Sequence, residues 1–332
     1  MKIILGVESS CDETSVAVVD GGRILSNVIS SQWMHRQFGG VVPEISARAH
    51  LRLMPELIRA ALDESGVTLQ QLDAIAVTEG PGLMGPLLVG VSMAKSLAFS
   101  LGIPVIPVNH IESHLYASFP GNEPPPFPFI GLIVSGGHTS LVVAREGFRY
   151  ELLGQTRDDA AGEAFDKIAK VLGLGYPGGP VVDRLAVTGS SDWVTFPRPM
   201  INSDDFDFSF SGLKTAVIQY LKSNQETARQ HLPDLCASVQ AAITSVLVSK
   251  TLKAVRETGI KTVVVAGGVS ANSELRKRFS DAEKQHHLRL YLPTPLLSTD
   301  NAAMVALLAL MKGPAFAAPH YQLTPKPTLA IH

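Results

Sequence analysis

The fold is decided by the opening stretch IILGVESSCDETSVAVVDGGRILSNVI, residues 3–29. Residues 3–7 and 16–19 are apolar runs of the length of a buried strand, and a polar turn separates them. The tripeptide Asp20-Gly21-Gly22 is typical of a tight hairpin turn. The stretch therefore predicts two strands joined by a turn, and a hairpin into a third strand at residues 24–29.

The same pattern returns 125 residues later, with residue 139 in the place of residue 14. Residues 139–144 (TSLVVA) align with residues 14–19 (TSVAVV), and Gly147 aligns with Gly22. A repeated strand–turn–strand–hairpin unit predicts an α/β protein of two similar lobes, each built around its own sheet.

The boundary between the lobes is predicted in the Pro-rich segment NEPPPFP, residues 122–128. We expect an N-terminal lobe at residues 1–125 and a C-terminal lobe at residues 126–299. Residues 302–311 are apolar on every face of a helix, so that helix must be buried. We expect it, within residues 300–312, to pack back on the N-terminal lobe.

The composition limits the possible partners and compartments. The chain has 332 residues, a net charge of −2 and two cysteines, Cys11 and Cys236, which form no C-x-x-C pair. A protein that binds nucleic acid unaided usually carries a basic excess, so a local patch or a partner would have to supply it. No targeting or membrane segment is recognisable, and a reduced, cytoplasmic setting is the simplest interpretation.

Two histidines offer a candidate metal site. His110 and His114 are four residues apart, so on a helix they share one face and can share one ion. A surface or core pair of histidines is the alternative. Asp300 is the best candidate for a third ligand, since two His and one carboxylate leave positions open for substrate. Metallopeptidase motifs need a Glu where this chain has Ile111 or Ser113, so we predict no peptidase activity.

Glycine-rich turns offer candidate phosphate sites. The turns at residues 135–138 (SGGH), 176–180 (YPGGP) and 267–272 (GGVSAN) could present backbone N–H groups to a nucleotide, or could be ordinary turns. Asp12 and Glu13 could hold a cation or steer a nucleophile, or could form a solvated turn. The alternating segment at residues 206–214 could be a half-buried strand or a loop over substrate.

Together these motifs resemble one family over nearly the whole chain: the bacterial TsaD/YgjD (Kae/Gcp) family of tRNA adenosine threonylcarbamoyltransferases. The motifs that carry the resemblance are ESSCDET at residues 8–14, GGVVPE at 39–44, GPGL at 80–83, His110 with His114, VSGGHT at 134–139, GEAFDK at 162–167, YPGGP at 176–180, FSFSGLK at 208–214, AGGVSAN at 266–272 and TDN at 299–301.

The resemblance implies the actin/Hsp70/sugar-kinase fold with duplicated mixed sheets. It implies transfer of a threonylcarbamoyl group from threonylcarbamoyl-adenylate to the exocyclic amine of the tRNA adenosine next to the anticodon, in tRNAs that read ANN codons, with release of AMP. It implies one metal, iron(II) or zinc, on His110, His114 and Asp300. The residues that it implies in adenylate binding are Val134, Ser135, Gly136, Gly137, His138, Asp166, Gly179, Asp183 and Asn272. Whether Asp12, Glu13 or no residue acts as a base stays open.

The resemblance also implies two protein partners, a shorter paralogue and a small ATPase. We expect the paralogue to bind the apolar face of a helix at residues 51–62, which includes Leu51 and Met54, because the N-terminal sheet need not cover that face. Two rivals remain: a sugar or acetate kinase on the same fold, which needs no such metal site, and a non-catalytic paralogue, which would lack it.

Overall fold

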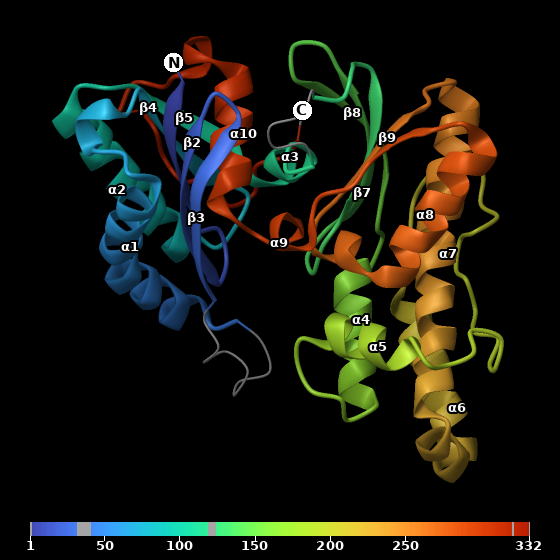
Figure 1. Ribbon diagram of the computed structural model, residues 1–332. Helices are drawn as coiled ribbons and strands as arrows, with labels where there is room; N and C mark the ends of the chain where they lie inside the picture. Colours follow the sequence, from blue (N-terminus) through green and yellow to red (C-terminus); the bar gives the residue numbers. More distant parts are fainter. Residues whose placement is uncertain (1, 32–40, 119–123, 321, 332) are drawn as a thin grey trace. The chain divides into compact units, whose positions relative to one another are not determined.

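The computed structural model describes residues 2–31, 41–118, 124–320 and 322–331 (Figure 1). The chain forms two compact units: unit 1 contains residues 1–124 and 299–331, and unit 2 contains residues 125–298. Unit 1 is therefore discontinuous in sequence. The motif residues Gly39 and Gly40, and Asn122 and Glu123 of the Pro-rich segment, lie outside the described residues.

Unit 1 is built on a five-stranded mixed sheet. Its strands, in chain order, are β1 (Ile3–Glu8), β2 (Glu13–Asp20), β3 (Arg23–Ser31), β4 (Ala74–Gly80) and β5 (Val105–Asn109). The spatial order is β3-β2-β1-β4-β5, with antiparallel pairing among the first three and parallel pairing from β1 to β4 and β5.

Unit 2 repeats this sheet. Its strands are β6 (Phe129–Val134), β7 (Thr139–Arg145), β8 (Arg149–Gln155), β9 (Thr262–Ala266) and β10 (Arg289–Tyr291), in the spatial order β10-β9-β6-β7-β8. The register is conserved as well: Leu5 pairs with Val18 and Ile130 pairs with Val143, so both partners move by 125 residues. The predicted duplication is confirmed.

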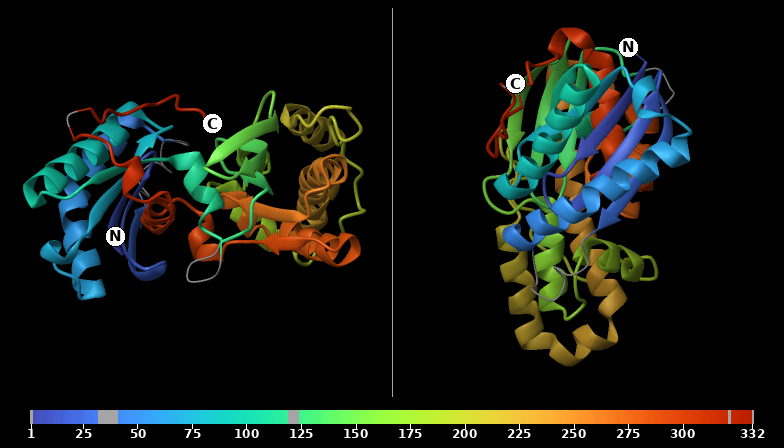
Figure 2. Two further views of the ribbon diagram at one scale, coloured as in Figure 1. Left: turned by 90° about the horizontal axis from the view of Figure 1, so that it is seen from above. Right: turned by 90° about the vertical axis from the view of Figure 1, so that its left-hand side faces the viewer.

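Helices cover both faces of the unit 1 sheet (Figure 1, Figure 2). Side chains alternate along β1, so Leu5 and Val7 pack in one core with α1 (Pro43–Ser65) and α2 (Met84–Leu101). Gly6 points to the other face, where α10 (Ala302–Lys312) crosses so closely that a Cβ on Gly6 would meet the Ala302 carbonyl oxygen. The buried helix predicted at residues 302–311 is confirmed, and it packs against β1 and β2.

The prediction that the apolar face at residues 51–62 is free to bind a partner is wrong. Met54 is fully buried and Leu57, Ile58 and Ala61 lie in the core beneath α1, because the sheet does cover this stripe. Leu51 alone among the apolar residues that predicted the face is strongly exposed, at 63%. The exposed apolar side chains of this part of unit 1 lie on the outer side of α1 and α2 instead. We call them the α1–α2 apolar face: Leu51, Met84, Leu88 and Phe99.

Unit 2 contains long helices that the sequence analysis did not predict. They are α4 (Ala161–Val171), α5 (Gly178–Ala186), α6 (Ser211–Gln230) and α7 (Leu232–Thr258). The turn at Gly267-Gly268 leads into a further helix, α8 (Ser273–His286). Of the two forms predicted for the segment 206–214, the half-buried strand is wrong, and a loop over substrate stays a prediction for residues 206–210. Phe208 makes a single bridge to Thr156, and α6 begins at Ser211. Short helices complete the described chain at Leu69–Gln71, His110–Leu115 (α3), Gly268–Ala271, Pro295–Ser298 (α9) and Pro314–Phe316.

Two helices, α2 and α7, are long and apolar enough to cross a bilayer by length and composition alone. In α7, 83% of the apolar window is buried, which makes it the core helix of unit 2. In α2 only 33% is buried, and the exposed remainder includes the α1–α2 apolar face. Both helices pack against neighbouring elements of their own unit. This packing explains why their side chains are apolar.

Candidate metal centre and nucleotide loops

The two histidines stand at the junction of a strand and a short helix. Strand β5 ends at Asn109, whose side-chain oxygen accepts hydrogen bonds from the N–H groups of Ile111 (2.9 Å) and Glu112 (3.1 Å). This cap starts α3 at His110 and brings His114 onto the same side one turn later. The ring centroids are 4.8 Å apart, and both residues are buried.

Asp300 comes to the histidines from the far end of the chain. Its neighbour Asn301 caps α10 by accepting a hydrogen bond from the N–H of Met304, at 3.1 Å. The N–H of Ala302 donates to the Ser15 hydroxyl of β2 at 2.9 Å, which fixes the start of α10 on the sheet. Asp300 Oδ1 then lies 3.2 Å from His114 Nε2 and 3.6 Å from His110 Nε2.

The three side chains fit a metal ion. One ligand atom from each of His110, His114 and Asp300 lies within 4.8 Å of the others. Both ring nitrogens of His114 are buried and make no hydrogen bond within the described residues, although Nε2 lies 3.2 Å from Asp300 Oδ1. A buried polar atom without a hydrogen bond is costly, and a cation bound at Nε2 would give that nitrogen a partner. Two imidazoles and one carboxylate suit zinc or iron(II), with positions left for substrate.

Negative charge accumulates around this triad. Burial raises the pKa of Glu13 to about 10, and the nearby carboxylates of Asp300, Asp12 and Glu8 act in the same direction. Burial lowers the pKa of His110, but Asp300 and Glu8 outweigh it and raise that pKa to about 9. The site therefore favours positive charge, which a divalent cation would supply. Burial and Asp12 also raise the pKa of the Cys11 thiol, so this cysteine stays protonated.

A buried ion pair ties the two helices of the triad together. Glu112 lies between the histidines in sequence, and its carboxylate is 2.6 Å from the ammonium group of Lys312 at the end of α10. Both side chains are nearly buried, at 5% and 11% exposed. The pair joins α3, which carries the histidines, to the helix that follows Asp300.

In unit 2 the predicted loop at residues 135–138 is an organised turn. The Ser135 hydroxyl accepts hydrogen bonds from the N–H groups of Gly137 (3.3 Å) and His138 (3.1 Å). A Cβ at Gly136 or Gly137 would meet no atom within 4 Å, so the turn is open on its outer side. Helix α4 begins behind it, and the N–H of Gly162 donates to the Ser135 carbonyl at 3.1 Å.

The other predicted adenylate residues hold the backbone around the beginnings of α5 and α8. Asp166 accepts a hydrogen bond from the N–H of Gly178, next to Gly179, at 2.7 Å, and burial still raises its pKa. The carboxylate of Asp183 accepts a hydrogen bond from the Ser273 hydroxyl at 2.7 Å. Their roles toward a nucleotide stay predictions.

Asn272 has a clear structural role. Its side-chain oxygen caps α8 by accepting from the N–H of Leu275 at 3.0 Å, and its amide nitrogen donates to Gln240 at 2.9 Å. Any contact with an adenosine must therefore be made alongside these two bonds.

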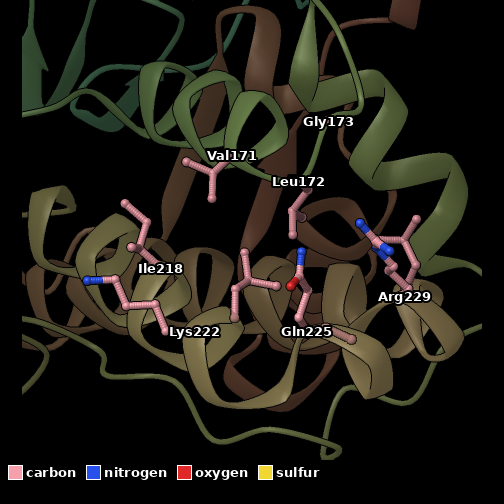
Figure 3. Close-up of a pocket in the computed structure, with 10 residues that line it drawn as sticks. Val171, Leu172, Gly173, Ile218, Lys222, Gln225 and Arg229 are labelled. Atoms are coloured by element: carbon pink, nitrogen blue, oxygen red, sulfur yellow. The ribbon is translucent and has the colours of Figure 1, made fainter.

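A separate cavity of about 520 Å³ lies between the end of α4 and α6 (Figure 3). Figure 3 shows Val171 and Leu172 from the end of α4 and Ile218, Lys222, Gln225 and Arg229 from α6 around it. None of the residues predicted to bind the adenylate lines it.

The family described as tRNA N6-adenosine threonylcarbamoyltransferase matches residues 23–307. The chain belongs to this family. The resemblance inferred from the motifs is thereby confirmed.

Curated members of the tRNA N6-adenosine threonylcarbamoyltransferase family match over almost their full length. The chain is 52% identical over 322 residues to the Chloroherpeton thalassium member, with 93% of this chain and 92% of the relative covered. It is 54% identical over 308 residues to the Geotalea uraniireducens member, with 92% and 90% covered. Rivals that would lack the metal triad are therefore set aside.

Solved structures support the predicted fold class. Component A of the (R)-2-hydroxyglutaryl-CoA dehydratase of Acidaminococcus fermentans has a TM-score of 0.55 at 16% identity and covers 94% of this chain and 99% of its own. Full-length HypF in its phosphate- and nucleotide-bound form has a TM-score of 0.61 at 14% identity and covers 95% of this chain and 47% of its own. At these identities the likeness concerns the fold alone, and it confirms the actin/Hsp70/sugar-kinase class.

Proposed function

We propose that this protein transfers the threonylcarbamoyl group of threonylcarbamoyl-adenylate to the exocyclic amine of the tRNA adenosine next to the anticodon, in tRNAs that read ANN codons. The observation that carries the proposal is the family match over residues 23–307. The amine nitrogen forms a bond to the carbamoyl carbon, the bond from that carbon to the phosphate oxygen breaks, and AMP leaves. The amine loses one proton.

The two units divide the work in this proposal. His110, His114 and Asp300 of unit 1 hold one divalent metal, iron(II) or zinc. When bound, the metal acts as a Lewis acid for the carbamoyl oxygens, whose charge grows in the transition state. Val134, the turn at residues 135–138, Asp166, Gly179, Asp183 and Asn272 of unit 2 hold the adenylate. The open outer side of Gly136 and Gly137 supports a phosphate site, because backbone there can approach an anion closely.

Asp12 and Glu13 of the first turn are the two candidates for a base. Burial and the neighbouring carboxylates raise the pKa of Glu13 to about 10 in the site without a cation, and a bound divalent cation would lower it. Since the donor is an activated mixed anhydride, the reaction does not need a built nucleophile. Both Asp12 and Glu13 therefore stay candidates for a base.

Metal analysis beside a transfer assay tests the proposal. Wild-type protein should contain close to one metal ion per chain, and Asp300→Asn, which keeps size and shape, should contain far less. His286→Ala is the matched control, since His286 is exposed on α8, and its metal content should be unchanged. Transfer from threonylcarbamoyl-adenylate to tRNA should follow metal content. Equal metal in wild type and Asp300→Asn would refute the triad, and absence of transfer by metal-loaded wild type with its partners would refute the reaction.

The same protein should have no peptidase activity. Ile111 and Ser113 stand where metallopeptidase motifs need a Glu, and neither side chain has the carboxylate that would act as the base on a water molecule. Metal-dependent cleavage of a glycoprotein by pure wild type, lost in His110→Ala, would contradict this.

We propose further that a shorter paralogue of the same fold binds the α1–α2 apolar face, and that a small ATPase completes a cytoplasmic complex. Leu51 (63% exposed), Leu88 (52%) and Phe99 (75%) are exposed apolar side chains, and Leu51 and Leu88 line one groove, which supports a docking surface there. Leu51→Glu with Leu88→Glu should abolish co-purification and leave the melting temperature unchanged. Met54 is unsuitable for this test because it is fully buried. A complex that survives the double substitution would place the partner elsewhere.

A further inference from the structure

Glu8 is a buried carboxylate with no role assigned so far. It ends strand β1 and is fully buried in unit 1. A charged side chain removed from water is costly unless its oxygens are bonded, so its partners indicate what it does.

Each oxygen of Glu8 has a distinct partner. Oε1 accepts a hydrogen bond from the N–H of Ser10 at 2.6 Å. Oε2 accepts one from the Thr78 hydroxyl at 2.6 Å and lies 3.1 Å from His110 Nδ1. Each oxygen thus accepts a hydrogen bond from a donor other than His110, which is the arrangement of a carboxylate and not of a carboxylic acid.

An ionised carboxylate can only accept hydrogen bonds, so Nδ1 of His110 must carry the proton of this contact. A neutral imidazole protonated at Nδ1 keeps its lone pair on Nε2. That nitrogen is the one that faces Asp300, at 3.6 Å. We propose that Glu8 is a positioning residue that holds His110 as the Nδ1–H tautomer and presents Nε2 to the metal.

The other neighbour of Nδ1 cannot do this. The Ser10 hydroxyl lies 3.2 Å from Nδ1, but a hydroxyl donates as readily as it accepts and selects neither tautomer. His114 contrasts with His110, since its Nδ1 has no hydrogen-bond partner within the described part of the chain. Glu8 therefore anchors one histidine of the pair, and the inference rests on the metal site proposed above. In general, carboxylates behind ligating histidines fix tautomer and ring orientation.

Glu8→Gln tests the tautomer directly. The Ser10 N–H still needs an acceptor, so the amide oxygen takes the Oε1 position and the NH₂ group takes the Oε2 position. That NH₂ group donates to His110 Nδ1 and drives the proton to Nε2, which blocks the ligand atom. The opposite amide orientation is unfavourable, because it places the NH₂ group against the Ser10 N–H and brings two donors together. Zinc affinity, measured by chelator competition, should fall by roughly 10–100-fold.

Thr78→Val is the matched control. It removes the other hydrogen bond to Oε2 at nearly constant volume and leaves the carboxylate to accept from Nδ1. Its zinc affinity should stay within about threefold of wild type, because the lost hydrogen bond goes to Glu8 and leaves the contact between Glu8 and His110 in place. AMP binding by unit 2 should be retained in both variants and reports on folding.

A measurement on wild type keeps the proposal testable if Glu8→Gln does not fold. Nitrogen-15 spectra of the zinc-loaded protein should show His110 with zinc on Nε2 and an exchange-protected proton on Nδ1. Zinc on Nδ1, or wild-type zinc affinity in Glu8→Gln, overturns the role of Glu8 and leaves the metal centre standing. Wild type that binds no zinc or iron(II) at all refutes the metal centre itself, and the role of Glu8 with it.

Discussion

The two units share one sheet and differ in the turn that joins its first two strands. With the offset of 125 residues, Asp12 corresponds to Gly137, and Glu13 corresponds to His138. The turn of unit 1 is acidic and half-buried, whereas the turn of unit 2 is exposed and offers open backbone at Gly136 and Gly137. The same framework thus favours a cation in one unit and admits an anion in the other.

The strand that leads into each turn differs in charge in the same way as the turn itself. Glu8 corresponds to Ile133, so unit 1 has a buried carboxylate where unit 2 has an apolar core residue. Burying the carboxylate is tolerable because Ser10, Thr78 and His110 bond it. The comparison teaches that a few side-chain changes at one turn give the two copies of a duplicated sheet opposite electrostatic character.

The largest effect should come from unit 1. His110→Ala removes a ligand of the centre that stabilises charge in the transition state, so kcat should fall by roughly 100-fold to 1,000-fold. The Kd for AMP should stay within about twofold, since the adenosine is assigned to unit 2. Single-turnover transfer to tRNA and calorimetric titration of AMP measure the two quantities. A parallel loss of AMP affinity would mean that the metal serves the nucleotide phosphate and that the division of labour is wrong.

A substitution in unit 2 can give its turn the negative charge that the corresponding turn of unit 1 carries. Gly137→Asp places a carboxylate where we propose the donor phosphate, and repulsion should weaken AMP binding about tenfold, or ~1.4 kcal/mol. Gly137→Ala is the control, because a Cβ there meets no atom within 4 Å. Calorimetry with AMP should find the alanine variant near wild type. Equal affinity in all three proteins would place the phosphate away from this turn.

Asn272→Ala should weaken donor binding about as much as Gly137→Asp does, and should also lower stability. Loss of one hydrogen bond to the donor should raise KM by roughly tenfold. The same change removes the cap on the Leu275 N–H, so unfolding free energy should fall by about 1 kcal/mol as well. Steady-state kinetics and denaturant titration separate the two. A stability loss with unchanged KM would show that Asn272 serves only the helix.

The smallest effect concerns the stability of unit 2. Burial raises the pKa of Asp158, but hydrogen bonds from Ser209, Phe210 and Ser211 outweigh it and lower that pKa. A group whose folded pKa lies below its unfolded value stabilises the fold above the unfolded pKa, and this contribution disappears as pH falls through the folded one. Asp158→Asn should cost about 1 kcal/mol at pH 7, with the difference shrinking below about pH 4.

Denaturant titration of wild type and Asp158→Asn across pH provides the measurement. The metal content of unit 1 should be the same in both, which serves as the control. A stability difference independent of pH would mean that the shape of the side chain matters and its charge does not.

Local patterns made part of this molecule predictable. The repeat at residues 14 and 139 predicted the duplicated sheets, and the spacing of His110 and His114 predicted one shared face. Met54 was misplaced because an apolar stripe shows which residues share a face, but not whether another element covers it.

Glu8 could not have been found from its neighbours in sequence. It bonds Thr78 and His110, which are 70 and 102 residues away, so only the folded sheet brings the three together. The same holds for the pair of Glu112 and Lys312, 200 residues apart. Helix α7 was not predictable from an amphipathic stripe, because it is buried on nearly every face.

Because unit 1 is discontinuous in sequence, its two parts are synthesised at different times. His114 leaves the ribosome 186 residues ahead of Asp300 (300 minus 114), with the whole of unit 2 made in between. At roughly 5–20 residues per second, the histidines wait about 10–40 s for their third ligand. During that interval β1 also lacks α10, the helix that packs over Gly6. The triad can therefore be completed only after the whole of unit 2 has been made, and a chain cut short anywhere in unit 2 lacks the third residue of the proposed metal site.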